Sequence, residues 1–338
     1  SSSGSLLMLQ LQKVNMFVIK MKQMFTVAFL LAVTCGGRVV SGSWGYGPDN
    51  GPDTWSSQYP YCGGEGQSPV NIDSSDVWYS SSLHTFEMEN YDHIPAHAHW
   101  ELVNTGQTLV LEMGGGDYWL REGGYSDDYK LSRLEWHWGR DDSSGAEHSI
   151  DNKGGPAEMQ MVHYNAKYKS YEEALQNHDG IIVLAFLYMV GKEENAAYHH
   201  IFTKLANVSH PGDRLVLRPL PLLSLLPGNL NTYYRYQGSL TTPPCVEGIS
   251  WTLFTHRVEL SRRQLKTLRS KLFETERVSP NRQVMSPPLR PQRPVGMRAV
   301  YSNIHEHATV FSSPLSSPVS ITLAVFFGFV LLFVFMRI

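Results

Sequence analysis

Alternating apolar and polar positions in the middle of the chain predict β-strands. The alternation is clearest over residues 131–138 and 158–163. Successive side chains of a strand point to opposite faces, so each of these segments predicts a strand with one buried face. Residues 180–190 are almost wholly apolar, which predicts a strand buried on both faces.

Helical signals are sparse and short. Ser170 stands three residues before Glu173, and Ser261 three residues before Gln264, and both spacings are typical of a capping box at a helix start. Between residue 44 and about residue 300 there is no linker, low-complexity tract or repeat. The pattern predicts one mainly β domain, a large sheet with a few peripheral helices.

The amino-terminal segment has the layout of a secretory signal peptide. Lys20 and Lys22 precede an apolar run over residues 24–33, and small residues follow that run. We therefore expect residues 1–43 to be a leader and the extracellular body to begin at Trp44.

The carboxyl-terminal segment predicts attachment to a membrane. A spacer rich in Ser and Pro, residues 302–318, precedes an apolar stretch over residues 319–336 that is closed only by Arg337 and Ile338. Eighteen residues just reach across a bilayer. One arginine is no cluster of positive charge, so the 319–338 tail resembles a GPI signal more than a retained single-pass type I span, and the alternative stays open. Either one predicts a domain at the cell surface.

Charge excludes one class of partner. Lys and Arg number 28 against 31 Asp and Glu, a formal net charge of −3, and no basic block or basic aromatic run occurs. The electrostatic signature of a nucleic-acid-binding protein is therefore absent.

Cysteine usage agrees with an extracellular domain. Of the three cysteines, Cys35 is expected to leave with the leader, which leaves Cys62 and Cys245 as a pair in an oxidising compartment. We expect a disulfide between them. The sequon at Asn207 predicts a glycosylated surface loop.

Several stretches of the body together resemble the α-class carbonic anhydrases, in the order and at the spacing of that family. They are Trp44-Gly-Tyr-Gly47, Asn50-Gly51-Pro52, Trp55, Gln67-Ser-Pro-Val70, Trp136-His-Trp-Gly139, Glu147-His148 and Gly238-Ser-Leu-Thr-Thr-Pro-Pro244. The resemblance covers nearly the whole body, over residues 44–301. It implies a single domain with a central twisted, mostly antiparallel sheet of about ten strands, short peripheral helices and a conical cleft. It also implies a zinc ion that hydrates CO2 to bicarbonate, and a disulfide joining Cys62 to Cys245 in secreted and membrane-anchored members.

The zinc ligands that the resemblance implies are largely replaced. The family uses three histidines, two from one strand and one from the next, and the matching positions here are Glu135, His137 and Gln160. Glutamate can ligate zinc, but its charge opposes the acidification of bound water that neutral imidazoles allow, and an amide oxygen is a poor zinc ligand. Zinc occupancy is therefore doubtful.

A nearby cation strengthens that doubt. Arg133 stands where the family commonly has a Gln that supports the first ligand, and it shares a strand face with Glu135, so the two side chains are expected to pair. His137 is then interpreted as a cleft histidine, hydrogen-bonded or protonated against Glu135, rather than as a zinc ligand.

Other positions match the family's cleft in part. Gln107 occupies the proton-shuttle position, where an amide cannot titrate. Thr241 and Glu147 match the pair that orients a zinc-bound hydroxide. The apolar wall for CO2 matches Val162, Val183, Leu240, Thr242 and Trp251, which serve equally well as core residues.

Several remaining histidines and aromatics have structural interpretations. His148 and His163 are expected to be buried and hydrogen-bonded, and the pairs His97/His99 and His305/His307 to lie on the surface. An aromatic cluster under the amino-terminal segment is expected from Trp44, Tyr46 and Trp55.

Three functions follow from this pattern. The first is a membrane-tethered, extracellular relative of carbonic anhydrase that lacks or nearly lacks CO2 hydration and binds another molecule, such as an extracellular protein. The second is a weak zinc carbonic anhydrase that uses Glu135, His137 and Gln160, with CO2 and bicarbonate as ligands only if zinc is held. A purely structural surface domain is the third.

Overall fold

The computed structural model describes residues 44–305. The leader and most of the tail lie outside the described residues, and so do the interpretations that rest on them. Within residues 44–305, no helix is long and apolar enough to cross a membrane.

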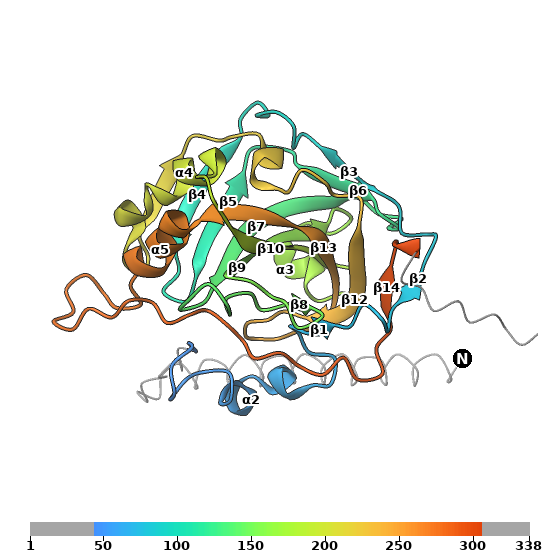
Figure 1. Cartoon of the computed structure of the whole chain (residues 1–338), viewed down its shortest axis with the longest axis horizontal. Coiled ribbons are helices and arrows are strands. Elements are labelled where there is room, and N and C mark those ends of the chain that lie inside the picture. Colours follow the sequence, from blue (N-terminus) through green and yellow to red (C-terminus); the bar gives the residue numbers. More distant parts are fainter. Residues whose placement is uncertain (1–43, 306–338) are drawn as a thin grey trace, which may run out of the picture. The chain divides into compact units, whose positions relative to one another are not determined.

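The domain is mainly β, built on one large mixed sheet of twelve strands (Figure 1). Its strand order is β11-β4-β5-β7-β9-β10-β13-β12-β14-β2, with β3 and β6 attached beside β7, and a separate two-stranded sheet joins β1 to β8. Pairing is antiparallel except for β10 with β13, β14 with β2 and β1 with β8. The prediction of a large, mostly antiparallel sheet is confirmed.

The strands are β1 (Asn71–Ile72), β2 (Trp78–Tyr79), β3 (Phe86–Glu89), β4 (His99–Asn104), β5 (Leu109–Gly114), β6 (Trp119–Glu122), β7 (Tyr129–Trp138), β8 (Ser149–Ile150), β9 (Ala157–Asn165), β10 (Ile181–Gly191), β11 (Arg214–Leu217), β12 (Tyr233–Ser239), β13 (Glu247–Ser261) and β14 (Val300–Ser302). The helices are α2 (Trp55–Gln58), α3 (Tyr171–Ala174), α4 (Ala196–Phe202) and α5 (Arg262–Lys271), with 3-10 turns η1 (Pro60–Gly63), η2 (Leu205–Val208) and η3 (Leu222–Leu225).

The three strands predicted from the hydrophobic pattern are β7, β9 and β10. Strand β10 separates two apolar cores, because its side chains alternate between them. Leu184 and Phe186 belong to the larger core, whereas Val183 and Ala185 belong to the smaller one. The predicted burial of both faces is confirmed.

Both predicted helix starts are observed. The Ser170 hydroxyl caps α3 by accepting from the backbone N–H of Glu173 at 3.3 Å. At α5 the capping box is complete, since Ser261 accepts from the backbone of Gln264 and the Gln264 side chain accepts from the backbone of Ser261.

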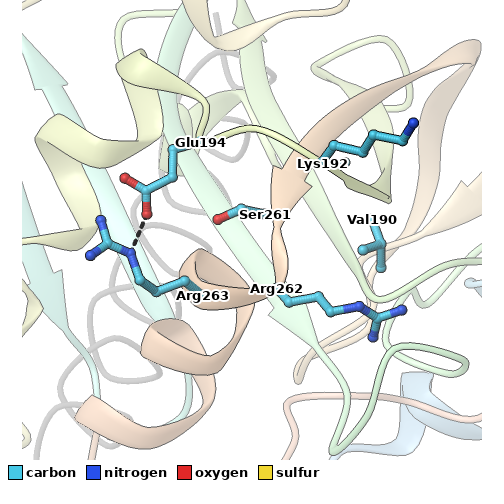
Figure 2. A pocket seen from close by; sticks show the side chains of 7 residues that line it. Val190, Lys192, Glu194, Ser261, Arg262 and Arg263 are labelled. Atoms are coloured by element: carbon cyan, nitrogen blue, oxygen red, sulfur yellow. Dashed lines mark hydrogen bonds and ion pairs between the residues drawn. The ribbon is translucent and has the colours of Figure 1, made fainter.

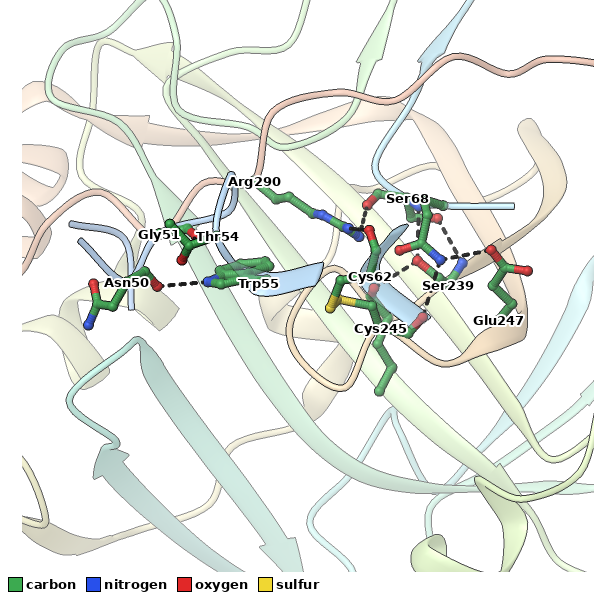
Figure 3. Close-up of a disulfide and its surroundings, with 12 residues drawn as sticks. Asn50, Gly51, Thr54, Trp55, Cys62, Ser68, Ser239, Cys245, Glu247 and Arg290 are labelled. Atoms are coloured by element: carbon green, nitrogen blue, oxygen red, sulfur yellow. Dashed lines mark hydrogen bonds between the residues drawn. A yellow bond between two sulfur atoms is a disulfide. The ribbon is translucent and has the colours of Figure 1, made fainter. Parts of the chain in front are cut away.

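A disulfide fastens the amino-terminal segment to the sheet (Figure 3). Cys62 on η1 and Cys245, in the loop after β12, are bonded with their Cα atoms 4.9 Å apart, which confirms the predicted pair. The Arg290 guanidinium reinforces this attachment by donating to the backbone carbonyls of Cys62 and Ser68, both at 2.9 Å. The disulfide and the arginine thus hold the same segment at adjacent points.

An aromatic cluster packs in the same segment, as predicted. The rings of Trp44, Tyr46 and Trp55 meet edge to face with centroids 5.5–5.8 Å apart. The indole N–H of Trp55 donates to the carbonyl of Asn50 at 2.9 Å, so the buried ring is also satisfied in hydrogen bonding.

Candidate active site

The polar side chains of the site come from neighbouring strands β7 and β9. Along β7 the tryptophans 136 and 138 face the larger core, so Glu135 and His137 face the opposite side. Strand β9 is paired so that Glu135 lies opposite Gln160, and His137 opposite Glu158. The three positions that match the family's ligands are therefore brought together on one face.

His137 is fully buried and hydrogen-bonded on one side only. Its Nδ1 lies 2.6 Å from the carbonyl oxygen of Pro288, which can only accept, so Nδ1 carries a proton. Among the described residues its Nε2 has no partner. Burial lowers the pKa of His137, but the nearby carboxylates Glu147 and Glu158 outweigh burial, and the net pKa lies above its ordinary value.

Glu135 is paired with an arginine instead of facing His137. The Nε of Arg133 donates to the Glu135 carboxylate, and the Arg133 guanidinium also donates to the Tyr171 hydroxyl and lies 4.5 Å from the centre of that ring. Burial raises the pKa of Glu135, yet the charge and hydrogen bond of Arg133, together with the charge of His137, outweigh burial and hold the net pKa below its ordinary value. The expected Arg133–Glu135 pair is observed.

The interpretation of His137 as the partner of Glu135 is wrong. The carboxylate within ion-pair distance of the His137 ring is Glu147, at 3.5 Å from Nδ1. Glu135 is instead held by Arg133, which lies two residues earlier on β7 and whose long side chain reaches the carboxylate along the same face of the strand.

Gln160 joins two buried carboxylates. Its amide nitrogen donates to Glu147 Oε2 and to Glu158 Oε1, both at 2.9 Å. Because carboxylates accept and do not donate when ionised, this arrangement fixes which end of the amide faces them. Only the amide oxygen of Gln160 is left for a metal ion.

Glu147 is a buried carboxylate that accepts hydrogen bonds from two other segments of the site. Besides the amide of Gln160, it accepts from the backbone N–H of Arg290 at 2.9 Å. Burial raises the pKa of Glu147 above its ordinary value, although His137 and the hydroxyl of Thr241 lower it in part. Thr241 thus acts on the carboxylate with which the family resemblance pairs it.

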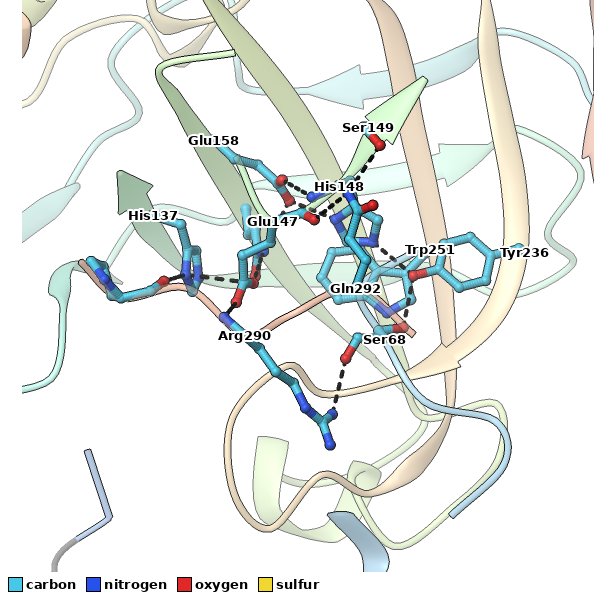
Figure 4. Close-up of polar contacts among 12 residues, drawn as sticks. Ser68, His137, Glu147, His148, Ser149, Glu158, Tyr236, Trp251, Arg290 and Gln292 are labelled. Atoms are coloured by element: carbon cyan, nitrogen blue, oxygen red, sulfur yellow. Dashed lines mark hydrogen bonds and ion pairs between the residues drawn. The ribbon is translucent and has the colours of Figure 1, made fainter. Parts of the chain in front are cut away.

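A second buried chain of hydrogen bonds begins at Glu158 (Figure 4). This carboxylate accepts from the backbone of His148 at 2.7 Å and lies 2.8 Å from its Nδ1. His148 Nε2 is 2.7 Å from the hydroxyl of Tyr236, which is in turn 2.7 Å from Ser68 Oγ. Burial raises the pKa of Glu158, but His148 outweighs it and holds the net pKa below its ordinary value.

Sequence reasoning missed Glu158, Tyr236 and Arg290 as parts of this network. Glu158 could have been found, because it stands two residues before Gln160 and therefore shares its strand face. Tyr236 and Arg290 carry no local signal, since their partners are more than sixty residues away in the chain.

The predicted apolar wall is a row across three strands. Val162 on β9 is paired with Val183 on β10, which is paired with Trp251 on β13. All three are buried in the smaller core, and Leu240 packs partly buried against it. Thr242, in the loop after β12, is partly exposed.

Gln107, at the proton-shuttle position, lies outside the hydrogen-bond network of the site. Its amide nitrogen is 3.5 Å from the carbonyl of Trp44.

Comparison with known proteins identifies the family of this site. The family model for eukaryotic-type carbonic anhydrases matches residues 50–304. The chain belongs to the carbonic anhydrase family. It is 36% identical to mouse (Mus musculus) carbonic anhydrase 15 over 304 residues, which cover 87% of this chain and 93% of that protein. Human (Homo sapiens) carbonic anhydrase 12 is 33% identical over 289 residues, which cover 84% of this chain and 80% of that protein. Mouse carbonic anhydrase 6 is 32% identical over 275 residues, which cover 80% of this chain and 84% of that protein.

Carbonic anhydrases normally hold zinc, and the residues of this site fit zinc poorly. Of the three ligand positions, only His137 presents an unpartnered nitrogen. Glu135 is occupied by Arg133, and the Gln160 amide nitrogen faces two carboxylates. Among the described residues, no group of three His, Cys, Asp or Glu is placed to hold a metal ion.

His163, beside this carbonic anhydrase site, is a buried neutral histidine as expected. Its Nδ1–H donates a hydrogen bond to the carbonyl of Met161 at 3.0 Å, and its Nε2 lies 2.7 Å from the hydroxyl of Tyr91. Burial lowers the pKa of His163 to about 3.

This histidine predicts a pH dependence of stability. The unfolded state takes up a proton on His163 below about pH 6.5 and the folded state does not, so this stability is complete above pH 6.5 and is lost as pH falls. Between pH 6 and pH 4 the free energy of unfolding should fall by about 1.4 kcal/mol per pH unit from this residue. In urea unfolding at several pH values, the free energy of unfolding should change less steeply with pH in His163→Gln than in the unmodified protein. In His84→Gln, a variant of an exposed histidine, the slope against pH should be unchanged. Equal slopes in all three proteins would contradict the assignment.

The remaining predicted positions lie on the surface of the domain. Asn207 is exposed on η2, His97 and His99 are exposed near the start of β4, and the His305 ring meets the Tyr79 ring edge to face. His307 lies outside the described residues.

Proposed function

We propose that this chain is an extracellular carbonic anhydrase family protein whose former active site lacks catalytic zinc, and that it serves as a binding domain without meaningful CO2 hydration. The observation that carries the proposal is the use of two ligand positions for other bonds. Glu135 neutralises Arg133, and Gln160 bridges Glu147 and Glu158.

The electrostatics of the site support this proposal. A zinc ion bound at Glu135 would have to displace or repel the guanidinium of Arg133, which already satisfies that carboxylate. The arginine also rests on the Tyr171 ring, so it is held in place by a second contact. Arg133 therefore supplies to Glu135 the positive charge that a metal would otherwise bring.

A weak zinc carbonic anhydrase is the second candidate. It is favoured by two observations, the unpartnered Nε2 of His137 and the retained contact between Thr241 and Glu147. When bound, zinc supplies a nucleophilic hydroxide at neutral pH. On this alternative, His137 would bind the ion with Glu135 and Gln160, and Thr241 would orient its fourth ligand.

Titration with zinc separates the two candidates. Protein dialysed against a chelator is titrated with zinc in a calorimeter, beside the variant His137→Ala. We expect the two proteins to give the same weak binding, with a dissociation constant of about micromolar or weaker, because one imidazole without two further strong ligands makes no tight site. A tight one-to-one site that disappears in His137→Ala would support the second candidate.

We also propose that the domain is tethered at the cell surface through a GPI anchor added near the 302–318 spacer. The composition of the tail supports this, with Ser-rich sequence before an apolar stretch that ends in a single arginine. Asn207 is proposed as a glycosylation site, and its exposure is consistent with modification.

Phospholipase treatment tests the anchor. Phosphatidylinositol-specific phospholipase should release the extracellular domain, without residues 319–338, from intact expressing cells, since cleavage removes the lipid. A matched control replaces the tail with an established transmembrane helix and should stay on the cells. Retention of the native protein, with residues 319–338 found in its mass, would show a membrane-spanning tail instead.

A further inference from the structure

A groove with mostly basic walls lies beside helices α4 and α5, at one end of the sheet (Figure 1). Two adjoining cavities of about 790 and 300 Å³ form it, between the end of β10, α4 and α5. Both are lined by Arg263 and Glu194, and we call them together the α4–α5 groove (Figure 2). Its other charged or titratable lining residues are Lys192, Arg262, Lys271 and His199.

Helix α5 presents the positive charge. Its ten residues contain five Lys or Arg and no Asp or Glu. Gln264, Leu265 and Leu268 are buried and fix the helix on the domain, which leaves Arg262, Arg263, Lys266 and Lys271 exposed to solvent. The apolar face explains why the helix exists, but it does not explain why the exposed face is uniformly basic.

The acidic partners in the groove leave most of this charge available. Arg262 pairs with Asp142 and Arg263 with Glu194, but the two arginine side chains are 75% and 72% exposed. Exposed pairs of this kind contribute little and exchange readily. Each guanidinium has five N–H donors, so a single contact with a carboxylate leaves donors for a ligand.

The local charge contrasts with the whole chain. The lining of the groove holds Lys192, Arg262, Arg263 and Lys271 against the one carboxylate of Glu194, in a chain whose formal net charge is −3. An uneven distribution of this size creates a field that attracts anions to one part of the surface.

The chemistry of the lining selects among polyanions. Ser261, Thr203 and Thr267 add hydroxyl groups beside the cations, which suits a ligand that carries both hydroxyls and anionic groups. Phe202 is the aromatic residue of the lining and is buried at 2% exposure, so no ring is offered for stacking nucleobases. Helices α4 and α5 lie at one end of the sheet, whereas β14, near which the described chain ends, lies toward the other (Figure 1). A surface away from the end of the described chain favours a ligand other than the anchoring membrane.

We propose that the α4–α5 groove binds a linear sulfated polysaccharide of the cell surface or extracellular matrix. Arginine binds sulfate through paired N–H donors, and a chain of sulfated sugars can place successive anionic groups along both cavities. The proposal agrees with the extracellular location proposed above. It does not depend on the zinc site, because none of the groove residues belongs to that site.

Binding to immobilised heparin tests the groove with matched variants. Full-length protein, treated with a chelator, is compared with the triple variant Arg262→Gln/Arg263→Gln/Lys266→Gln. The control triple variant Lys130→Gln/Lys153→Gln/Lys169→Gln removes the same charge from other elements. At 0.15 M NaCl we expect the α5 variant to bind at least about tenfold more weakly and with a smaller salt dependence, since fewer counterions are released. The control should change less than about twofold.

A gain of binding guards against misfolding as the cause. Glu194→Gln removes the acidic group that the two cavities share, so heparin should bind more tightly than to the unmodified protein. Desulfated heparin should not bind. The proposal would be overturned if both triple variants lost heparin binding equally, or if Glu194→Gln bound heparin no more tightly. It would also be overturned if single-stranded DNA competed as well as heparin, or if the protein bound phosphatidylserine vesicles but not heparin.

Discussion

The variant Arg133→Gln/Glu135→His/Gln160→His is expected to bind one zinc ion per chain and to hydrate CO2. The unmodified protein is expected to bind far less than one zinc per chain and to hydrate CO2 no faster than buffer. The strand register already places positions 135 and 160 opposite each other, on the face that carries His137. His137 Nδ1 is oriented by the Pro288 carbonyl, so its Nε2 is ready to bind. Glu158 can accept the second N–H of an imidazole introduced at position 160, as it now accepts the Gln160 amide.

Changing Arg133 is expected to be essential for full recovery. With only Glu135 and Gln160 replaced, the guanidinium of Arg133 would lose its carboxylate and stand unpaired beside the incoming cation. We expect the triple variant to exceed the double variant by about 10- to 100-fold in zinc affinity, the usual effect of groups that support metal ligands. Zinc content and CO2 hydration should rise together.

A matched control keeps the same loss of charge with one ligand fewer. Arg133→Gln/Glu135→His/Gln160→Asn offers two imidazoles and should show weak zinc binding and no hydration. If the triple variant folds, holds stoichiometric zinc and still fails to hydrate CO2, the former active site is damaged beyond its ligands.

Removing Arg133 alone should lower the stability of the domain markedly. Arg133→Met leaves Glu135, whose side chain is only 14% exposed, without its cation, and the expected loss is about 2–4 kcal/mol at pH 7. Adding Glu135→Leu should recover most of that loss, because the uncompensated charge is then gone. Lys130→Met, which breaks an exposed pair with Asp117, should cost less than about 1 kcal/mol.

The pH dependence gives this prediction a second readout. The folded pKa of Glu135 lies below its ordinary value, so the pair stabilises the fold above the unfolded pKa of about 4.3 and loses that effect as pH falls through the folded pKa. The difference between the unmodified protein and Arg133→Met in urea unfolding should therefore shrink at pH 3. A difference that is the same at pH 3 and pH 7 would show that the arginine acts by packing alone.

The hydrophobic pattern was sufficient to predict the elements that position the site. Alternation placed Glu135 and His137 on one face of β7, because side-chain direction in a strand follows from position alone. That Gln160 on β9 joins them was implied by the resemblance to carbonic anhydrases. The same reasoning predicted that Arg133 would meet Glu135, two residues away. The Cys62–Cys245 bond followed from the number of cysteines and the expected compartment.

The rest of the site depends on contacts that sequence position does not reveal. Whether His137 faces Glu135 or Glu147 is decided by Pro288, which reaches Nδ1 from 151 residues away. The orientation of the Gln160 amide depends on two carboxylates from different segments, and Arg290 and Tyr236 join the network through the tertiary fold. A tally of ligand positions could show that zinc binding was in doubt, but it could not show that hydrogen bonds had replaced it.

Zinc content and CO2 hydration, measured on one preparation of the unmodified protein, test the central claim most directly. The protein is produced in secretory cells with zinc in the medium, and its metal is quantified by mass spectrometry before hydration is followed by stopped flow. The arrangement of Arg133, Glu135 and Gln160 predicts far less than one zinc per chain and hydration no faster than the buffer alone. One zinc per chain, with hydration that a chelator abolishes, would contradict it.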